Sequence, residues 1–225
     1  MSVEKALVYG SPNIGVYVTV TENEAFIAAD APEKFEEAIK SALSVEVHRV
    51  SLLNSPLVGV FLVANSNGML IPKHAHEHEI NTLKRIAGEN MEVGVLDLKE
   101  TALGNLILTN DRVAIVSPII PRRVAEEIGS ILGVEVIRRN IAGSPLVGSF
   151  AVATRRGVLV CPLASEDELD ELESIFKIPV DVGTVNRGSI FIRAGIVANG
   201  KGAVVGYGTT GPELMRIHRV LFSKT

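Results

Sequence analysis

The sequence repeats a short phrase, Ser55-Pro56-Leu57-Val58-Gly59, which returns as Ser144-Pro145-Leu146-Val147-Gly148. A looser copy, Ser11-Pro12-Asn13-Ile14-Gly15, lies near the start of the chain. The closing glycines of these phrases, with Gly104 added, are separated by 44, 45 and 44 residues, and one further step of 45 residues reaches Arg193. Five copies of a unit of about 45 residues therefore account for the chain.

Each copy predicts the same series of elements, which is clearest in the second copy. An apolar run at 60–64 and a second one at 69–71 flank the turn residues 65–68, so this segment predicts a β-hairpin. The spacing of apolar residues over 75–86 predicts one buried helix face, and the alternation at 91–98 predicts a third strand. The unit is strand, strand, helix, strand.

The other copies repeat this order. The predicted strands lie at 16–20, 25–28 and 45–50, at 106–109, 113–116 and 134–138, at 150–153, 158–161 and 180–185, and at 196–198 and 203–206. The predicted helices lie at 32–43 and 121–132, from Ser165 onward, and at 212–221. Ser165 followed three residues later by Glu168 predicts a capping box at the start of its helix.

The fifth copy lacks a third strand, because only residues 222–225 follow its predicted helix. Residues 3–9 have the sequence position of a third strand with no unit in front of them. Placing this segment beside the fifth unit closes the set and leaves no open sheet edge between last and first units. We therefore predict an α/β fold in which five units form a closed ring, an α/β propeller with pseudo-fivefold symmetry, and the N-terminal strand completes the fifth unit.

The repeat also predicts the domain organisation. We expect one domain over 1–225, with repeats at approximately 14–57, 58–102, 103–146 and 147–190, and a last one made of 191–225 plus 1–13. The alternative is a doubly wound α/β sheet, which is built from single helical crossovers and fits poorly with units of strand, strand, helix and strand.

Composition limits the classes of function. The formal net charge is −4, which disfavours a bare phosphate backbone as the main partner. One cysteine excludes a disulfide framework within the chain. No apolar stretch reaches the roughly 18 residues that a membrane helix needs. We expect a cytoplasmic protein without membrane contact, and a monomer.

Cys161 and the histidines are the candidates for a chemical site. Cys161 follows an apolar strand, where a free cysteine is typical of a small buried hydrophobe rather than a nucleophile. His74 and His78 would share one face of a helix, as zinc-binding pairs do, but no third ligand follows from the spacing, and a solvated helix start explains them as well. His48 and His218 have no evident partner. We therefore assign no catalytic residue, no metal ligand and no cofactor.

Arginine pairs gather positive charge in the third unit and in the turn of the fourth. They are Arg122 and Arg123, Arg138 and Arg139, and Arg155 and Arg156. A local basic patch of this kind could contact RNA, and solvated surface arginines are the alternative. The acidic run over 166–173 fits the exposed first turns of a helix, where negative charge is favourable.

The sequence resembles the archaeal branch of the translation initiation factor six family. The resemblance is carried by Ala102-Leu103-Gly104-Asn105, by Leu146-Val147-Gly148-Ser149 and by Gly183-Thr184-Val185-Asn186-Arg187-Gly188-Ser189, and it extends from near residue 6 to Phe222. It implies the pentein fold, which is a five-unit ring. It also implies a non-enzymatic protein that binds the large ribosomal subunit near the sarcin-ricin loop, blocks joining of the small subunit and takes part in large-subunit biogenesis.

Two other classes of function stay open as alternatives. Enzymes of the same fold, guanidine-group hydrolases and amidinotransferases, need a Cys nucleophile with a His and a carboxylate, and in those enzymes the nucleophile lies in the final unit. A plain RNA-binding module is disfavoured by the acidic charge and by the aromatic content of 4% without tryptophan.

The fivefold repeat predicts a partner-binding rim. The residue after each anchor position is expected to begin a first strand, so these residues should lie at equivalent places around one end of the ring: Val16, Val60, Asn105, Ser149 and Ala194. The set is apolar or small, as interface centres tend to be, except for Asn105, whose amide can donate and accept at once. The alternative face is the opposite rim, which carries the hairpin turns at Asn67, Asp111 and Arg155.

Overall fold

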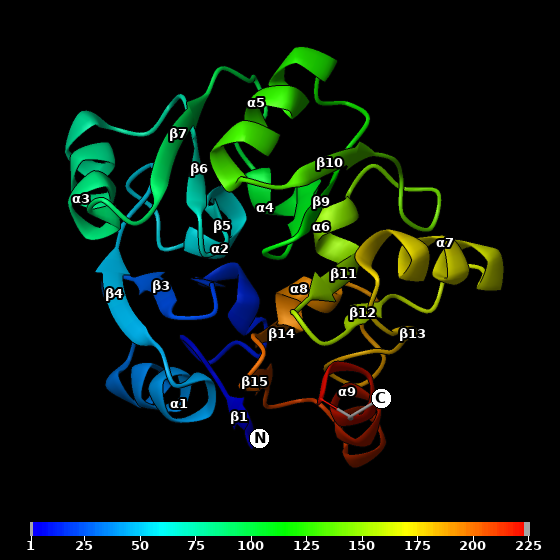
Figure 1. The fold of residues 1–225 in the computed structure, drawn as a ribbon. Helices are drawn as coiled ribbons and strands as arrows, with labels where there is room; N and C mark the ends of the chain where they lie inside the picture. The colour runs from blue at the N-terminus through cyan, green and yellow to red at the C-terminus, as the bar shows by residue number, and fades with distance from the viewer. Residues whose placement is uncertain (1, 223–225) are drawn as a thin grey trace.

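Five three-stranded sheets surround a central axis in the computed structural model, which describes residues 2–222 (Figure 1). The first strands are β2 (Val18–Val20), β5 (Val63–Ala64), β8 (Ile107–Thr109), β11 (Ala151–Ala153) and β14 (Ile196–Ala198). The second strands are β3 (Glu24–Ala28), β6 (Gly68–Pro72), β9 (Val113–Val116), β12 (Val158–Val160) and β15 (Gly202–Gly206). The third strands are β4 (Glu46–Val50), β7 (Glu92–Leu96), β10 (Glu135–Arg138), β13 (Val180–Val182) and β1 (Ser2–Ala6).

Every sheet is built by the same pairing rule. The first and second strands form an antiparallel hairpin, and the third strand pairs in parallel with the second. In the first four sheets the third strand follows a helical crossover, whereas in the fifth it is the N-terminal strand β1. The predicted order of strand, strand, helix and strand is confirmed. Several predicted strands were too long at one end. The largest differences are three residues, at the start of β5 and at the ends of β1 and β13.

Five amphipathic helices form the outer layer of the ring (Figure 1). They are α1 (Glu33–Leu43), α3 (Glu77–Ala87), α5 (Arg122–Leu132), α7 (Glu166–Phe176) and α9 (Gly211–Phe222). The Ser165 hydroxyl caps α7 by accepting a hydrogen bond from the Glu168 backbone N–H at 3.2 Å. The second half of the predicted capping box is wrong, because the Glu168 carboxylate accepts the Ala142 backbone N–H from the preceding loop instead.

A short helical turn stands in front of each first strand. These turns are η1 (Ile14–Val16), α2 (Val58–Phe61), α4 (Leu103–Leu106), α6 (Val147–Phe150) and α8 (Ile192–Gly195). The prediction that a strand begins directly after each anchor position is therefore wrong. Each anchor is the second residue of a helical turn, and the strand begins three or four residues after it; the anchors are Gly15, Gly59, Gly104, Gly148 and Arg193.

Close backbone packing of these turns explains the repeated glycine. A Cβ atom on Gly59 would collide with the carbonyl oxygen of Gly15, one on Gly104 with that of Gly59, and one on Gly148 with that of Gly104. A Cβ atom on Gly15 would collide with the carbonyl oxygen of Arg193, so the contact series returns to its start. Only glycine allows this approach, because any side chain would occupy the space of the neighbouring backbone.

The ring closes through the N-terminal strand. β1 pairs in parallel with β15 from Ser2 opposite Gly202 to Ala6 opposite Gly206, and this pairing completes the fifth sheet. In Figure 1 the blue start of the chain lies beside the orange β15. The predicted closure is confirmed, while the expectation that 223–225 add no strand lies outside the described residues.

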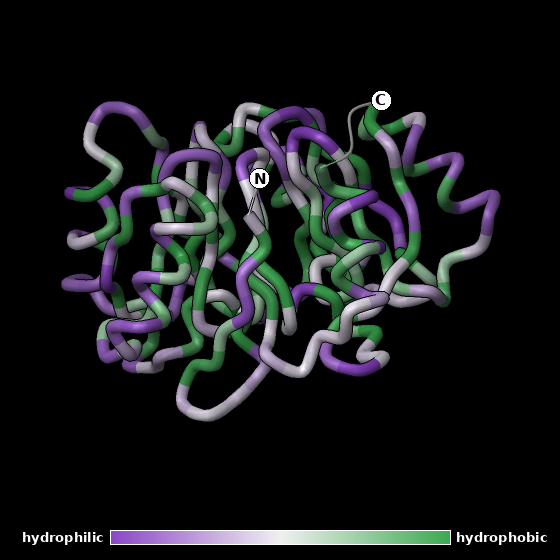
Figure 2. The backbone as a smooth tube through the Cα atoms, turned by 90° about the horizontal axis from the view of Figure 1, so that it is seen from below, coloured by the Kyte–Doolittle hydropathy of each residue, from purple (hydrophilic) through white to green (hydrophobic). Residues whose placement is uncertain are grey.

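The apolar core consists of three clusters that are distributed around the axis. These clusters of buried side chains fill the space between the sheets and the outer helices. Seen at right angles to the axis, the hydrophobic stretches follow the strands in the interior, and the outer helices alternate between hydrophobic and hydrophilic residues (Figure 2). Within residues 2–222, no helix combines the length and the apolar character that crossing a bilayer would require.

Candidate functional site

The five short helical turns surround a cavity at one end of the axis. The cavity has a volume of about 220 Å³, and its lining includes the five predicted rim residues Val16, Val60, Asn105, Ser149 and Ala194. The fivefold repeat thus predicted their convergence correctly. The predicted secondary structure was wrong, because all five lie on helical turns and not at strand starts.

Two exposed apolar side chains at this cavity were missed by sequence reasoning. Leu146 is 37% exposed and Phe191 is 47% exposed, and both line the cavity. Each is the residue directly before the helical turn of its unit, two positions before the anchor. The same repeat that gave the other five residues could have identified these two, had the position before the turn been compared between units.

Arg193 closes the floor of this cavity. Its guanidinium donates to the Gly59 carbonyl at 3.2 Å and lies 3.4 Å from the Thr19 hydroxyl, and among the residues described no carboxylate forms an ion pair with it. Burial lowers the pKa of Arg193 to about 10, which leaves the guanidinium charged at neutral pH. The cavity therefore has an apolar rim and one positive charge at its base.

Asn105 differs from the other asparagines that face the axis. Over 2–222 the structure assigns no hydrogen bond to its side-chain amide, and the residue is only partly buried. At the opposite end of the ring, the amides of Asn65, Asn110 and Asn199 are buried and donate to backbone carbonyls of neighbouring units at 2.8 to 3.4 Å. Asn105 therefore keeps its donor and acceptor available at the surface.

The opposite rim uses its polar groups within the molecule. Asn67 donates to the Leu132 carbonyl, Asp111 accepts from both the backbone and the hydroxyl of Ser66, and Arg155 lies 3.4 Å from the Glu22 carboxylate. The turns that carry the alternative binding face thus join neighbouring units. Fewer polar side chains are therefore available to bind a partner at this rim than at the rim around the cavity.

The predicted arginine patch is partly neutralised. Arg139 forms ion pairs with Glu168 and Glu171 of α7, at 3.6 Å and 2.7 Å. Arg122 and Arg138 are exposed and line a groove of about 500 Å³ between α5 and β10, and Arg123 is exposed on the same helix. Arg122 also pairs with Glu126 at 3.3 Å, but both side chains are largely exposed, so Arg122, Arg123 and Arg138 keep a solvent-facing charge.

The candidate chemical residues do not form an active site. Cys161 is fully buried in the core, and burial raises the pKa of its thiol, which is opposite to the shift that a nucleophilic thiolate needs. The alternative in which His74 and His78 share one helix face does not hold, because α3 begins at Glu77 and leaves His74 outside it. His78 instead stacks on His76 at 5.7 Å between ring centroids.

The chain is similar in sequence to proteins of one known family. The model of the eIF-6 family matches residues 3–220. The chain is 45% identical over 214 residues to the translation initiation factor 6 of Pyrobaculum aerophilum, covering 95% of this chain and 96% of that one. It is 42% identical over 224 residues to the protein of the same name from Pyrococcus horikoshii, with coverage of 98% and 99%. The chain belongs to the eIF-6 family of translation initiation factors.

Proposed function

We propose that this translation factor binds the large ribosomal subunit through the rim that surrounds the axial cavity, and that it thereby prevents the small subunit from joining. The observation that carries the proposal is the convergence of small and apolar side chains around one end of the ring, with the free amide of Asn105 among them. Small and apolar side chains with few charges among them are suited to a protein surface, because interface centres are depleted of charged residues. The protein acts by occupying this face and carries out no catalysis.

The chemistry of the rim favours ribosomal proteins near the sarcin-ricin loop as the direct partners. Leu146 and Phe191 offer exposed apolar area, and aromatic side chains contribute strongly to protein interfaces. The exposed Arg122, Arg123 and Arg138 lie in the third unit and supply charges that can contact ribosomal RNA from the side of the ring. A factor that covers the joining face in this way would also act on large subunits during their biogenesis.

Replacing Asn105 by Ser tests the proposal. The amide of Asn105 can bond a partner backbone, and a buried polar group that loses its partner costs about 1–2 kcal/mol. We expect large-subunit binding to weaken by roughly 5- to 30-fold, with an unchanged melting temperature, because the side chain makes no bond within the described structure. Co-sedimentation with purified large subunits, beside a thermal melt, measures both quantities.

Asn81 provides the matched control. It is exposed on α3, away from the cavity, so Asn81→Ser makes the same chemical change on the outer layer. Equal co-sedimentation of the two variants and the wild type would contradict the proposal and move the binding face to the opposite rim.

A further inference from the structure

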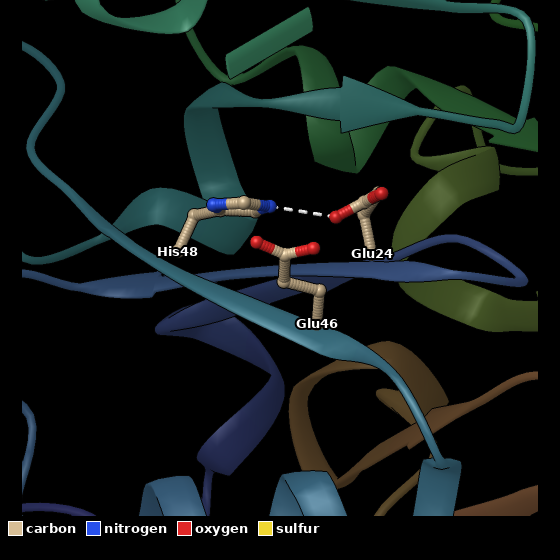
Figure 3. A group of neighbouring side chains, drawn as sticks. All are labelled: Glu24, Glu46 and His48. Atoms are coloured by element: carbon tan, nitrogen blue, oxygen red, sulfur yellow. Dashed lines mark hydrogen bonds and ion pairs between the residues drawn. The ribbon is translucent and has the colours of Figure 1, made fainter.

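Two glutamates and a histidine converge on the first sheet, on strands that lie 22 residues apart in sequence. One ligand atom from each of Glu24, Glu46 and His48 lies within 4.8 Å of the other two. The Nε2 atom of His48 is 2.6 Å from Oε2 of Glu24. Figure 3 shows the three side chains facing one another, with Glu24 on β3 and the other two on β4.

The strand register places the two carboxylates directly opposite each other. Glu24 pairs with Glu46, and two positions further along the strands Phe26 pairs with His48. Like charges in directly opposed positions destabilise a sheet. Within the described residues, the one ion pair formed by these two carboxylates is that between Glu24 and His48. A second positive charge would therefore be bound favourably here.

The other four units serve as internal comparisons. At the same register position the second unit has Glu92 opposite Gly68, and the third has Glu135 opposite Val113. The fourth and fifth units have no carboxylate at this position. The first unit alone combines a carboxylate on both strands with a histidine, so the cluster is not a consequence of the repeat.

Glu24 also occupies a position where three units have glycine. A Cβ atom on Gly68, Gly157 or Gly202 would collide with a backbone carbonyl near the end of the next unit's outer helix. Glu24 has the same place in its unit, nine residues after the anchor, yet its side chain is accommodated and is 29% exposed. The neighbouring unit therefore leaves room at this junction for the Glu24 side chain.

The ligands are held in place by the fold. The backbone N–H of Glu24 donates to the Thr21 hydroxyl at 3.0 Å, which fixes the end of the hairpin. The His48 ring lies 5.5 Å from the ring of the buried Phe26, and only 18% of its side chain is exposed. Glu46 is exposed and gives access from solvent. A site held by paired strands needs little rearrangement to bind.

We infer that Glu24, Glu46 and His48 form a binding site for a divalent transition metal ion of the zinc type, because one ligand atom of each lies within 4.8 Å of the other two. One imidazole nitrogen and two carboxylate oxygens are a ligand set that Zn²⁺ accepts, at metal–ligand distances of about 2.0–2.2 Å, with a fourth position for water. Mg²⁺ and Ca²⁺ prefer oxygen ligands alone, so the imidazole selects against them. The ion would replace the Glu24–His48 contact and neutralise the opposed carboxylates.

Calorimetric titration of Zn²⁺ into the full chain, stripped of metal with a chelator, tests the site at one fixed, slightly alkaline pH. We expect one binding event in the wild type that weakens by at least about tenfold in Glu46→Gln and in His48→Gln, because each change removes one of three ligands. Glu46→Gln changes an exposed group, so the variant is expected to fold. Mg²⁺ should give no comparable heat.

Two control variants separate this site from other zinc ligands. Glu92→Gln makes the same change at the equivalent position of the second unit and should bind Zn²⁺ like the wild type. The double variant His74→Gln/His78→Gln removes exposed imidazoles outside the cluster and should also leave the event intact. Absence of binding in the wild type, or its loss in the double variant with retention in Glu46→Gln and His48→Gln, would overturn the inference.

Discussion

A glutamate in the first turn of three outer helices holds the loop that leads into its own unit. Glu79 accepts the backbone N–H of Leu53 and Asn54, each at 3.0 Å, and Glu168 accepts that of Ala142. Glu213 repeats the contact in the fifth unit. The loop residues have positive φ angles, a conformation that needs such support in non-glycine residues. The helices thus fasten the connections between units.

Glu213 shows the strongest electrostatic effect of the three. Burial by itself would raise the pKa of its carboxyl, but hydrogen bonds from the backbone of Thr210 and Gly188 and from the hydroxyls of Thr184 and Thr210 outweigh it and lower the pKa to about 2. The side chain is 8% exposed, so solvent screens these interactions little. A carboxyl with a depressed pKa stabilises the fold in its charged form.

Glu213→Gln should therefore destabilise the protein in a pH-dependent way. From the depressed pKa we expect a loss of about 3 kcal/mol of unfolding free energy at neutral pH. The wild type loses this contribution as the pH falls from about 4.5 to about 2, so the difference between the two proteins should shrink over that interval. Denaturant unfolding at a series of pH values measures the difference, and a constant gap down to pH 2 would contradict the role given to the charge.

At the scale of elements, the helical turns explain where sequence reasoning was limited. The segment from Val58 to Ala64 is apolar and rich in β-branched residues, which is typical of a strand, yet its first four residues form α2. A turn of four residues is too short to display a helical period. The close contact of the Gly59 backbone with Gly15 in the neighbouring unit fixes this turn. Such contacts between units cannot be predicted from the apolar pattern within one segment.

The cluster of Glu24, Glu46 and His48 is not visible in the sequence for a similar reason. His48 has no evident partner there, because Glu24 is 24 residues away and only the parallel register of β3 and β4 brings the two together. His74 and His78 have a helical spacing in the sequence, although the helix begins after His74. Residues at helical spacing can be paired from the sequence, whereas residues on two parallel strands cannot be paired until their register is known.

The N-terminal strand gives a prediction at the element scale. Deleting residues 1–11 removes β1 and leaves one edge of β15 unpaired, where five residue pairs now form a parallel ladder. The buried Ala6 and Val8 are lost as well. We expect a loss of several kcal/mol of unfolding free energy, on the scale of a removed core element. A thermal melt measures it, and a truncated protein with the wild-type melting temperature would show that β1 does not close the ring.

At the scale of the whole molecule, the repeat predicted more than any single motif. The steps of 44 and 45 residues between anchors predicted the number of units. The apolar runs and turns within each step predicted the order of elements, and the position of residues 3–9 predicted the closure by β1. The same symmetry placed Val16, Val60 and Asn105 around one cavity. Departures from symmetry such as Arg193 at an anchor position and Phe191 two positions before it are visible in the sequence, but the exposure of Phe191 and the place of both residues at the cavity required the structure.

The two ends of the ring carry different kinds of side chain. One end carries apolar turns around a cavity with Arg193 at its floor, and the other carries hairpin turns whose polar groups join neighbouring units. This difference underlies the proposal that only the first end binds the large ribosomal subunit. Two substitutions that add negative charge, one at each end, distinguish the two faces.

The most direct test is co-sedimentation of Val60→Glu and Arg112→Glu with purified large ribosomal subunits. Val60 lines the axial cavity, whereas Arg112 is exposed in a hairpin turn at the opposite end. The change at Arg112 alters the net charge by more, so retained binding there would exclude a general charge effect. We expect Val60→Glu to abolish co-sedimentation and Arg112→Glu to bind like the wild type. Binding that survives Val60→Glu and is lost in Arg112→Glu would contradict binding through the rim around the cavity.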